Sequence, residues 1–195
     1  MLVAEDISAF KHVVVPIGVV VGLGVARVVV HVAQYIQKRD RVRFSATHVV
    51  WSATLLLLFV GLWWNLWGLR AIHAGTWSFF TLIYLLTGPT LLYVPSILVL
   101  PDVPDSGELD LGSLVDRVGR PILLFVAAYI FWLASIQITL LEEPVVAPQR
   151  ALEGLAVLVL LLGAVFPNRR MVAASGVMVL LLLVLGMSTV KAQLS

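Results

Sequence analysis

The sequence predicts an all-α polytopic transmembrane helix bundle with six spans and with both termini on the outer side of the membrane. Three observations support this prediction: the composition, six long apolar segments, and the distribution of lysine and arginine. Of the 195 residues, 61% are hydrophobic and only 12% are charged, and the mean hydropathy is +1.03. About a quarter of the residues of a soluble globular protein are charged. We therefore expect lipid to be the solvent for most of this chain.

Six apolar segments approach the length of about 20 residues with which a helix crosses about 30 Å of hydrocarbon. They are continuously apolar, whereas the strands of a membrane barrel alternate between apolar and polar residues. The fifth segment is the shortest and is bounded by prolines. We expect one transmembrane domain over residues 1–195, with spans at about 13–36, 46–67, 77–100, 121–141, 151–166 and 171–190.

The distribution of basic residues predicts the orientation of these spans. The first, third and fifth connections together carry eight of the 13 lysines and arginines, the opposite side carries four, and Arg27 lies within a span. Loops rich in lysine and arginine face the cytoplasm, which places both termini outside. A rival model has five spans and an inward C-terminus, and it must hide Arg169 and Arg170 in the membrane.

The longest polar connection, residues 101–120, contains turn residues followed by an amphipathic pattern. The pattern predicts a separate helix over about 106–119 that lies along the inner membrane interface. Ser106 is placed to cap its start.

Arg27 is the most informative polar residue, because it lies only about three residues past the middle of the first predicted span and no carboxylate is expected at its depth. It must therefore be met by backbone carbonyls, hydroxyls, water, lipid phosphate or a ligand anion. His31 follows one helical turn later, and folding the chain back brings His48 and Ser52 to a similar depth. Such a cluster suits a pore or a proton-sensing site. It also suits a structural role, with the histidines in the headgroup region and a snorkelling arginine.

The first span also carries Gly18, Gly22 and Ala26 at four-residue spacing. Such a stripe of small residues lets another helix approach closely, in the same chain or in a partner. Gly24 provides a second narrow face.

The third span contains Thr87, Gly88, Pro89 and Thr90 near its midpoint. Proline removes a hydrogen-bond donor and bends the helix. The freed carbonyl beside two hydroxyls is a candidate ion or substrate contact, although such bends are often purely structural.

A smaller polar group is expected near the outer ends of the fourth and fifth spans. It contains Gln137 and Glu153, and Lys11 or His12 lies at a comparable height and is a candidate partner for the carboxylate.

Several function classes are disfavoured. The chain has no cysteine, which removes thiolate chemistry and thiolate metal sites, and its net charge of +2 is too small to indicate a nucleic-acid partner. The sequence contains no paired-carboxylate site in a span and no glycine-rich phosphate loop. We therefore expect no catalytic residues, no bound metal, no cofactor and no enzymatic activity.

The segments GLWWNLWGLR and TWSFFTLIYLLTGPTLLYVPSILVLPD carry the one resemblance to known proteins. Over Trp51 to Asp102 the chain resembles uncharacterised small bacterial integral membrane proteins in which a Trp-Trp pair precedes a span that ends in proline and aspartate. The resemblance implies a helical membrane architecture and no particular activity.

The sequence thus leads to three hypotheses for a multi-pass protein of the bacterial inner membrane. The first is a homo-oligomeric channel or transporter for an ion or small solute. The second is a non-conducting scaffold or accessory subunit that binds a membrane partner, and the third is a haem-carrying redox subunit.

Overall fold

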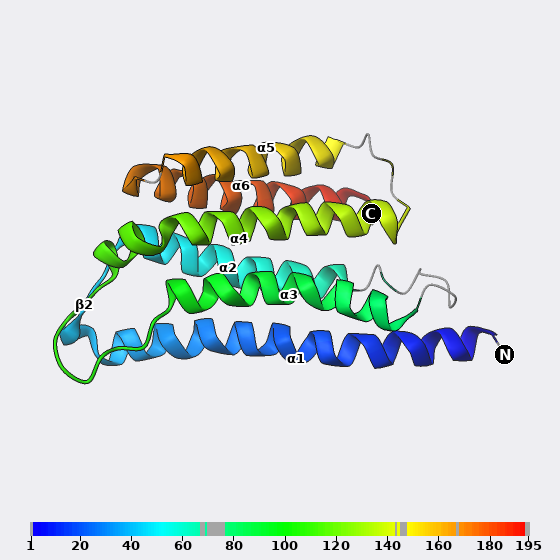
Figure 1. Cartoon of the computed structure of the whole chain (residues 1–195), viewed down its shortest axis with the longest axis horizontal. Coiled ribbons are helices and arrows are strands. Elements are labelled where there is room, and N and C mark those ends of the chain that lie inside the picture. The colour runs from blue at the N-terminus through cyan, green and yellow to red at the C-terminus, as the bar shows by residue number, and fades with distance from the viewer. Residues whose placement is uncertain are drawn as a thin grey trace.

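The computed structural model describes residues 2–66, 69, 77–142, 144, 148–166 and 168–193. Helices dominate these residues, as Figure 1 shows, which confirms the all-α prediction. The helices are α1 (Leu2–Gln37), α2 (Ala46–Asn65), α3 (Phe79–Val99), α4 (Leu111–Thr139), α5 (Pro148–Val165) and α6 (Arg169–Gln193), with a 3-10 turn η1 (Arg39–Arg41) and two short strands, β1 (Val42–Arg43) and β2 (Leu109–Asp110).

Four helices in the described part of the chain are long and apolar enough to cross a membrane. They are α2, α3, α4 and the Phe10–Gln37 part of α1. These lengths are compatible with a membrane protein, as the composition predicts. Six spans remain a prediction, because α5 and α6 are not among the four.

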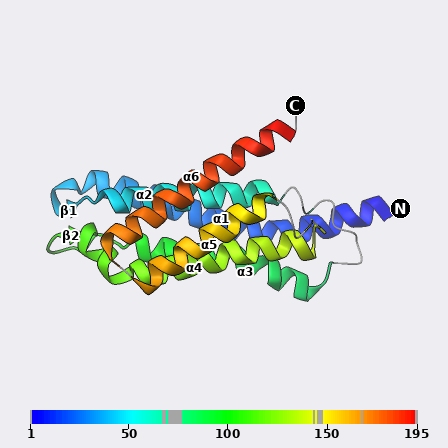
Figure 2. The same cartoon turned by 90° about the horizontal axis from the view of Figure 1, so that it is seen from above.

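The helices run side by side along one long axis, with α1 at one edge of the bundle and α5 at the other (Figure 1). Helix α3 packs against α1, α2 and α4, and α6 packs against α2, α4 and α5. Figure 2 shows the same elongated arrangement from above, with β1 and β2 together at one end and the start of α1 at the other.

Apolar side chains fill the middle of the bundle. Leu55, Phe59, Leu92, Leu123 and Leu160 come from four different helices and are fully buried. Interiors of this kind are packed as closely as organic crystals. The six helices therefore enclose an apolar core rather than a polar lumen along the part of the chain described.

The predicted interfacial helix over 106–119 is wrong. Helix α4 begins at Leu111 and continues through Pro121 as one helix. Its N-cap is Asp110, whose side chain accepts hydrogen bonds from the backbone N–H of Gly112 and Ser113, and not Ser106. The physical reason is that the apolar stripe of this segment is buried in the bundle, so it does not need headgroups to cover it.

The small-residue stripe of α1 lies mostly away from the bundle. Gly22 and Ala26 are exposed, and a Cβ atom at Gly18 would meet the ring edge of Trp63. The close approach within this chain occurs instead at Gly24, where the ring of Phe59 from α2 occupies the space of a side chain. The face of α1 that carries Gly24 thus packs against α2.

Gly24 and Gly22 form a matched pair for a stability test. A Cβ atom at Gly24 would lie 2.2 Å from Cζ of Phe59, whereas one at Gly22 would meet no atom within 4 Å. We expect Gly24→Ala to lower the free energy of unfolding by about 1–3 kcal/mol through overpacking, and Gly22→Ala to leave it unchanged or slightly raised. Unfolding in mixed micelles by titration with SDS measures both. Equal stability of the two variants would contradict the α1–α2 packing.

Candidate functional site at the end of helix α3

Three of the polar residues singled out in the sequence, Arg27, His31 and His48, gather around the C-terminal end of α3. The last carbonyls of a helix have no partner within the helix and need donors from elsewhere. Helix α3 ends at Val99, and its C-cap Leu100 has a non-helical backbone, which a following proline such as Pro101 favours. The carbonyls at this end are therefore available to side chains of other helices.

Three side chains each donate a hydrogen bond to one of three consecutive carbonyls at this end. Nε2 of His48 lies 2.9 Å from the Val99 oxygen, and Nη2 of Arg27 lies 2.9 Å from the Leu100 oxygen. The Tyr35 hydroxyl lies 2.7 Å from the oxygen of Pro101. Side chains of α1 and α2 thus bind the end of α3 from two sides.

Arg27 lies level with the end of α3 and not at the centre of the bundle. Helix α1 has 36 residues, or about 54 Å at about 1.5 Å per residue, so it is much longer than the hydrocarbon thickness of about 30 Å. Of the acceptors considered for it, a backbone carbonyl is the one the structure provides, and the negative end of the helix dipole suits the guanidinium.

His31 extends this arrangement to a carboxylate. Its Nδ1 lies 2.8 Å from the carbonyl oxygen of Arg27, and its Nε2 lies 3.0 Å from Oδ1 of Asp102. The His31 ring is buried, whereas the Asp102 side chain is 87% exposed. His31 was not paired with a carboxylate in the sequence; Asp102 reaches the ring because it lies in the connection that follows the end of α3.

Ser52 does not join the donors around α3. Its hydroxyl lies 2.9 Å from the carbonyl oxygen of His48, one turn earlier in the same helix. His48 itself is buried, and its ring packs against that of Tyr35 at a centroid distance of 5.5 Å. Tyr35 was missed in the sequence, although its position one turn after His31 on the face of Arg27 is a usable signal.

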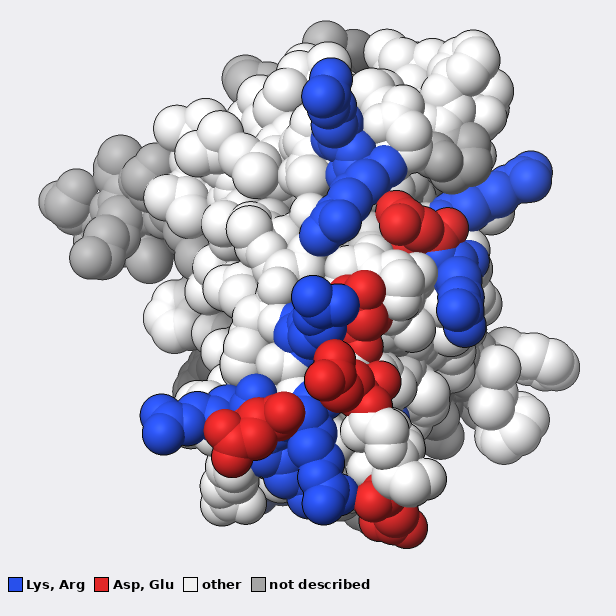
Figure 3. All heavy atoms as spheres, turned by 90° about the vertical axis from the view of Figure 1, so that its left-hand side faces the viewer, with Lys and Arg blue, Asp and Glu red and all other residues white. Residues whose placement is uncertain are grey.

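The same end of the bundle is held by contacts between its connections. Strands β1 and β2 pair in parallel, with Val42 opposite Leu109, and Arg41 donates to the Asp105 carbonyl at 2.9 Å. Arg169 at the start of α6 donates to the Ser45 hydroxyl at 3.1 Å. Figure 3 views this end and shows basic and acidic side chains interspersed across it. We call this end of the bundle, formed by the α1–α2, α3–α4 and α5–α6 connections, the charged platform.

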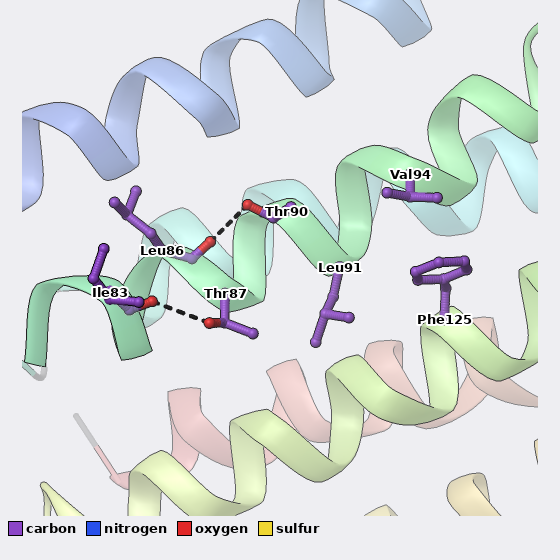
Figure 4. Close-up of a pocket in the computed structure, with 7 residues that line it drawn as sticks. All are labelled: Ile83, Leu86, Thr87, Thr90, Leu91, Val94 and Phe125. Carbon is purple, nitrogen blue, oxygen red and sulfur yellow. Dashed lines mark hydrogen bonds between the residues drawn. The ribbon is translucent and has the colours of Figure 1, made fainter. Parts of the chain in front are cut away.

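The bend in α3 is a separate feature at the bundle surface. Thr87 donates to the Ile83 carbonyl at 3.0 Å and Thr90 to the Leu86 carbonyl at 2.8 Å, as Figure 4 shows. Both threonines line an open, mostly apolar pocket of about 280 Å³ between α3 and Phe125 of α4. The hydroxyl protons are therefore already used within the helix.

Trp132 of α4 packs against the bend from the other side. Its ring occupies the space beside Gly88, and its Nε1 donates to the Tyr84 carbonyl at 2.8 Å. Pro89 is buried. An indole thus supports the region in which proline disturbs the backbone ladder.

The outer polar group is organised by Arg150. Its guanidinium donates to Oε1 of Gln137 and to Oε2 of Glu153, the latter at 2.6 Å. Glu153 thus pairs with Arg150 of its own helix. A contact of Glu153 with Lys11 or His12 stays a prediction.

Comparison of the chain with protein-family models, curated proteins and solved structures finds no match. Among the residues that the structure describes, no three His, Asp or Glu side chains are grouped so that they could hold a metal ion. The arrangement around α3 therefore has to be interpreted from its own geometry, which is that of a helix end bound by donors.

Removal of one donor tests this interpretation. Tyr35→Phe removes only the hydroxyl of a buried ring and leaves the Pro101 carbonyl short of a partner, so we expect a loss of about 1–3 kcal/mol in the free energy of unfolding. Tyr93→Phe on α3 is the matched control, because Tyr93 is only partly buried; we expect a change within about 0.5 kcal/mol. Equal effects in SDS titrations would show that the Tyr35 hydrogen bond does not hold α3.

Proposed function

We propose that the protein is a six-span protein of the bacterial inner membrane, with both termini outside, that acts as a non-conducting scaffold or accessory subunit. One observation carries the proposal: Nη2 of Arg27, both ring nitrogens of His31 and Nε2 of His48 bind the backbone or a carboxylate of the same chain. These residues organise the end of the bundle. The bacterial location rests on the resemblance over Trp51 to Asp102.

The charged platform is the surface that we assign to partner binding. It contains exposed acidic residues of the α3–α4 connection and exposed basic residues of the other two connections. Its backbone is fixed by the β1–β2 pairing and by the donors around α3. A surface held in this way offers fixed charges of both signs, which favour orientation and specificity of a partner. The proposal includes neither catalysis nor haem, since Nε2 of His48 and both ring nitrogens of His31 are already engaged.

An oligomeric channel or transporter is the second candidate. It is favoured by the two threonines at the α3 bend, because Thr87 and Thr90 are exposed on the outside of the bundle, where a second copy could contact them. Their oxygen lone pairs remain available as acceptors. A conducting path of this kind would run between copies and not through one apolar core.

Flux measurements separate the two candidates. We expect purified protein in liposomes to give ion and solute flux equal to that of protein-free liposomes, for the wild type and for Arg27→Leu alike. Flux from the wild type that falls in a Thr87→Val, Thr90→Val double variant would overturn the scaffold proposal in favour of conduction between copies.

A photo-crosslinker at Asp105 should yield a discrete product with another protein in native membranes, and one at the exposed Phe131 of α4 should not.

The topology is tested in the cysteine-free background that the chain provides. We expect Lys11→Cys to react with a membrane-impermeant maleimide in intact spheroplasts, because α1 begins at the end opposite the charged platform. Ser106→Cys should react only after the membrane is permeabilised, because the basic connections face the cytoplasm. The reverse pattern would invert the topology, and labelling of both from outside would exclude an odd number of crossings between them.

A further inference from the structure

The exposed face of α4 changes from basic to apolar along the helix. Arg117 and Arg120 are exposed near the charged platform, and the exposed residues that follow on the same face are apolar: Leu124, Ala128 and Phe131. Spacings of three and four residues place all five on one side of the helix. This face therefore carries positive charge only at the end that lies at a membrane surface in the proposed topology.

The packing of α3 against α4 gives the heights of the two arginines. The ring of Trp132 in α4 lies beside Gly88 of α3. Because the two helices run antiparallel (Figure 1), the same register brings Arg120 to about the height of Leu100, the residue that caps the end of α3. Arg117 lies about 4–5 Å farther from the middle of the bundle, since the helix rises about 1.5 Å per residue. Both guanidinium groups are thus placed at the height of lipid headgroups.

Neither arginine has a counter-charge within the part of the chain that the structure describes. The guanidinium groups of Arg117 and Arg120 form no hydrogen bond or ion pair there. Asp116 is exposed beside them on the same helix but is not paired with either. Arginine binds phosphate oxygens with short, charge-assisted hydrogen bonds, and basic residues next to a membrane attract anionic lipids. The two side chains therefore suit the phosphate of a phospholipid.

An apolar groove between α3 and α4 continues from these arginines toward the middle of the bundle. It is the open pocket of about 280 Å³ at the α3 bend, where Phe125 of α4 lies beside Leu91 and Val94 of α3 (Figure 4). Arg117 and Phe125 are eight residues apart, a spacing typical of one helix face. A molecule bound at the arginines can therefore extend along α4 into the groove.

The groove lies within the reach of an acyl chain from one leaflet. Thr90 precedes Leu100 by ten residues, or about 15 Å along α3. Half of a hydrocarbon core of about 30 Å has the same thickness. A chain whose headgroup lies at Arg120 thus extends as far as Thr90. The Thr90 hydroxyl already donates to the Leu86 carbonyl, so its proton needs no acceptor from a ligand.

We propose that this surface binds an anionic phospholipid, with the headgroup at Arg117 and Arg120 and one acyl chain in the groove beside Phe125. Charge complementarity selects the anionic headgroup, and the apolar walls accept the chain. An apolar helix from a second copy would fill the groove without supplying the anion. The inference rests on the membrane placement in the proposed function, and it does not depend on whether the charged platform binds a protein partner.

The test uses a bimane fluorophore at Ile97→Cys, one turn past Val94 on the exposed face of α3, in the otherwise cysteine-free chain. Leu23→Cys is the matched control, because Leu23 is exposed and lies one turn before Arg27, which reaches the Leu100 carbonyl. In phosphatidylcholine nanodiscs, brominated phosphatidylglycerol should half-quench the Ile97 probe at about one-tenth of the mole fraction that brominated phosphatidylcholine requires, because two arginines attract the anionic headgroup. The two brominated lipids should act alike on the Leu23 probe.

Paired substitutions identify the charges responsible. Arg117→Gln together with Arg120→Gln should abolish the tenfold preference at the Ile97 probe. Lys38→Gln together with Arg39→Gln removes the same charge from the α1–α2 connection and should keep the preference. All four side chains are exposed, so neither pair of substitutions disturbs the core.

The proposal is overturned if the two lipids half-quench the Ile97 probe at equal mole fractions, or if the Leu23 probe shows the same preference. It is also overturned if the preference survives loss of Arg117 and Arg120, or if loss of Lys38 and Arg39 removes it equally. Protection of the Ile97 probe from both lipids, with the Leu23 probe still quenched, would show that a second copy covers the groove. Absence of quenching at both positions would contradict the membrane placement itself, which the proposed function also needs.

Discussion

The need of the last carbonyls of α3 for hydrogen-bond donors is the constraint on which the rest of the structure depends. An unpaired carbonyl away from water costs free energy comparable to a lost hydrogen bond. Arg27 and Tyr35 supply donors from α1, and His48 supplies one from α2. These three bonds fix the heights of α1 and α2 relative to α3. They also bring the first and third connections close enough for β1 and β2 to pair.

The polar side chains of this chain divide by position, and each group has a structural partner. At the charged end they bind the end of α3 and the connections; at the opposite end Arg150 joins α4 to α5 through Gln137. Between them, the described core is mainly apolar, with a few buried hydroxyls such as those of Thr54 and Ser175, and the threonines of the α3 bend bond to their own helix. The cluster of Arg27, His31 and His48, which in the sequence suits a transport site, thus makes contacts that join helices in the fold.

The helical architecture could be predicted from the sequence because apolar segments of about 20 residues have few alternatives in lipid. The ends of α2 and α3 agree with the prediction to within two residues. The partner of Arg27 could not be predicted, since it depends on which carbonyl at the end of α3 lies beside it. Asp102 could not be assigned to the cluster either, because its position depends on the path of the chain after α3. Helix α4 was divided in error because the amphipathic pattern before Pro121 suggested a separate interfacial helix, whereas the apolar residues of this pattern are buried and continue the helix.

The contact between α2 and α6 has a consequence for how the protein is made. The indole N–H of Trp51 is buried and donates to the Val172 carbonyl, a residue 121 positions later in the chain. During synthesis, α2 leaves the ribosome long before α6 exists, so this donor has no acceptor in its final place until the last hairpin arrives. Until then the indole N–H of Trp51 lacks its acceptor in the protein. A chain arrested before α6 would keep this unpaired donor, which the quality-control machinery of the cell could detect.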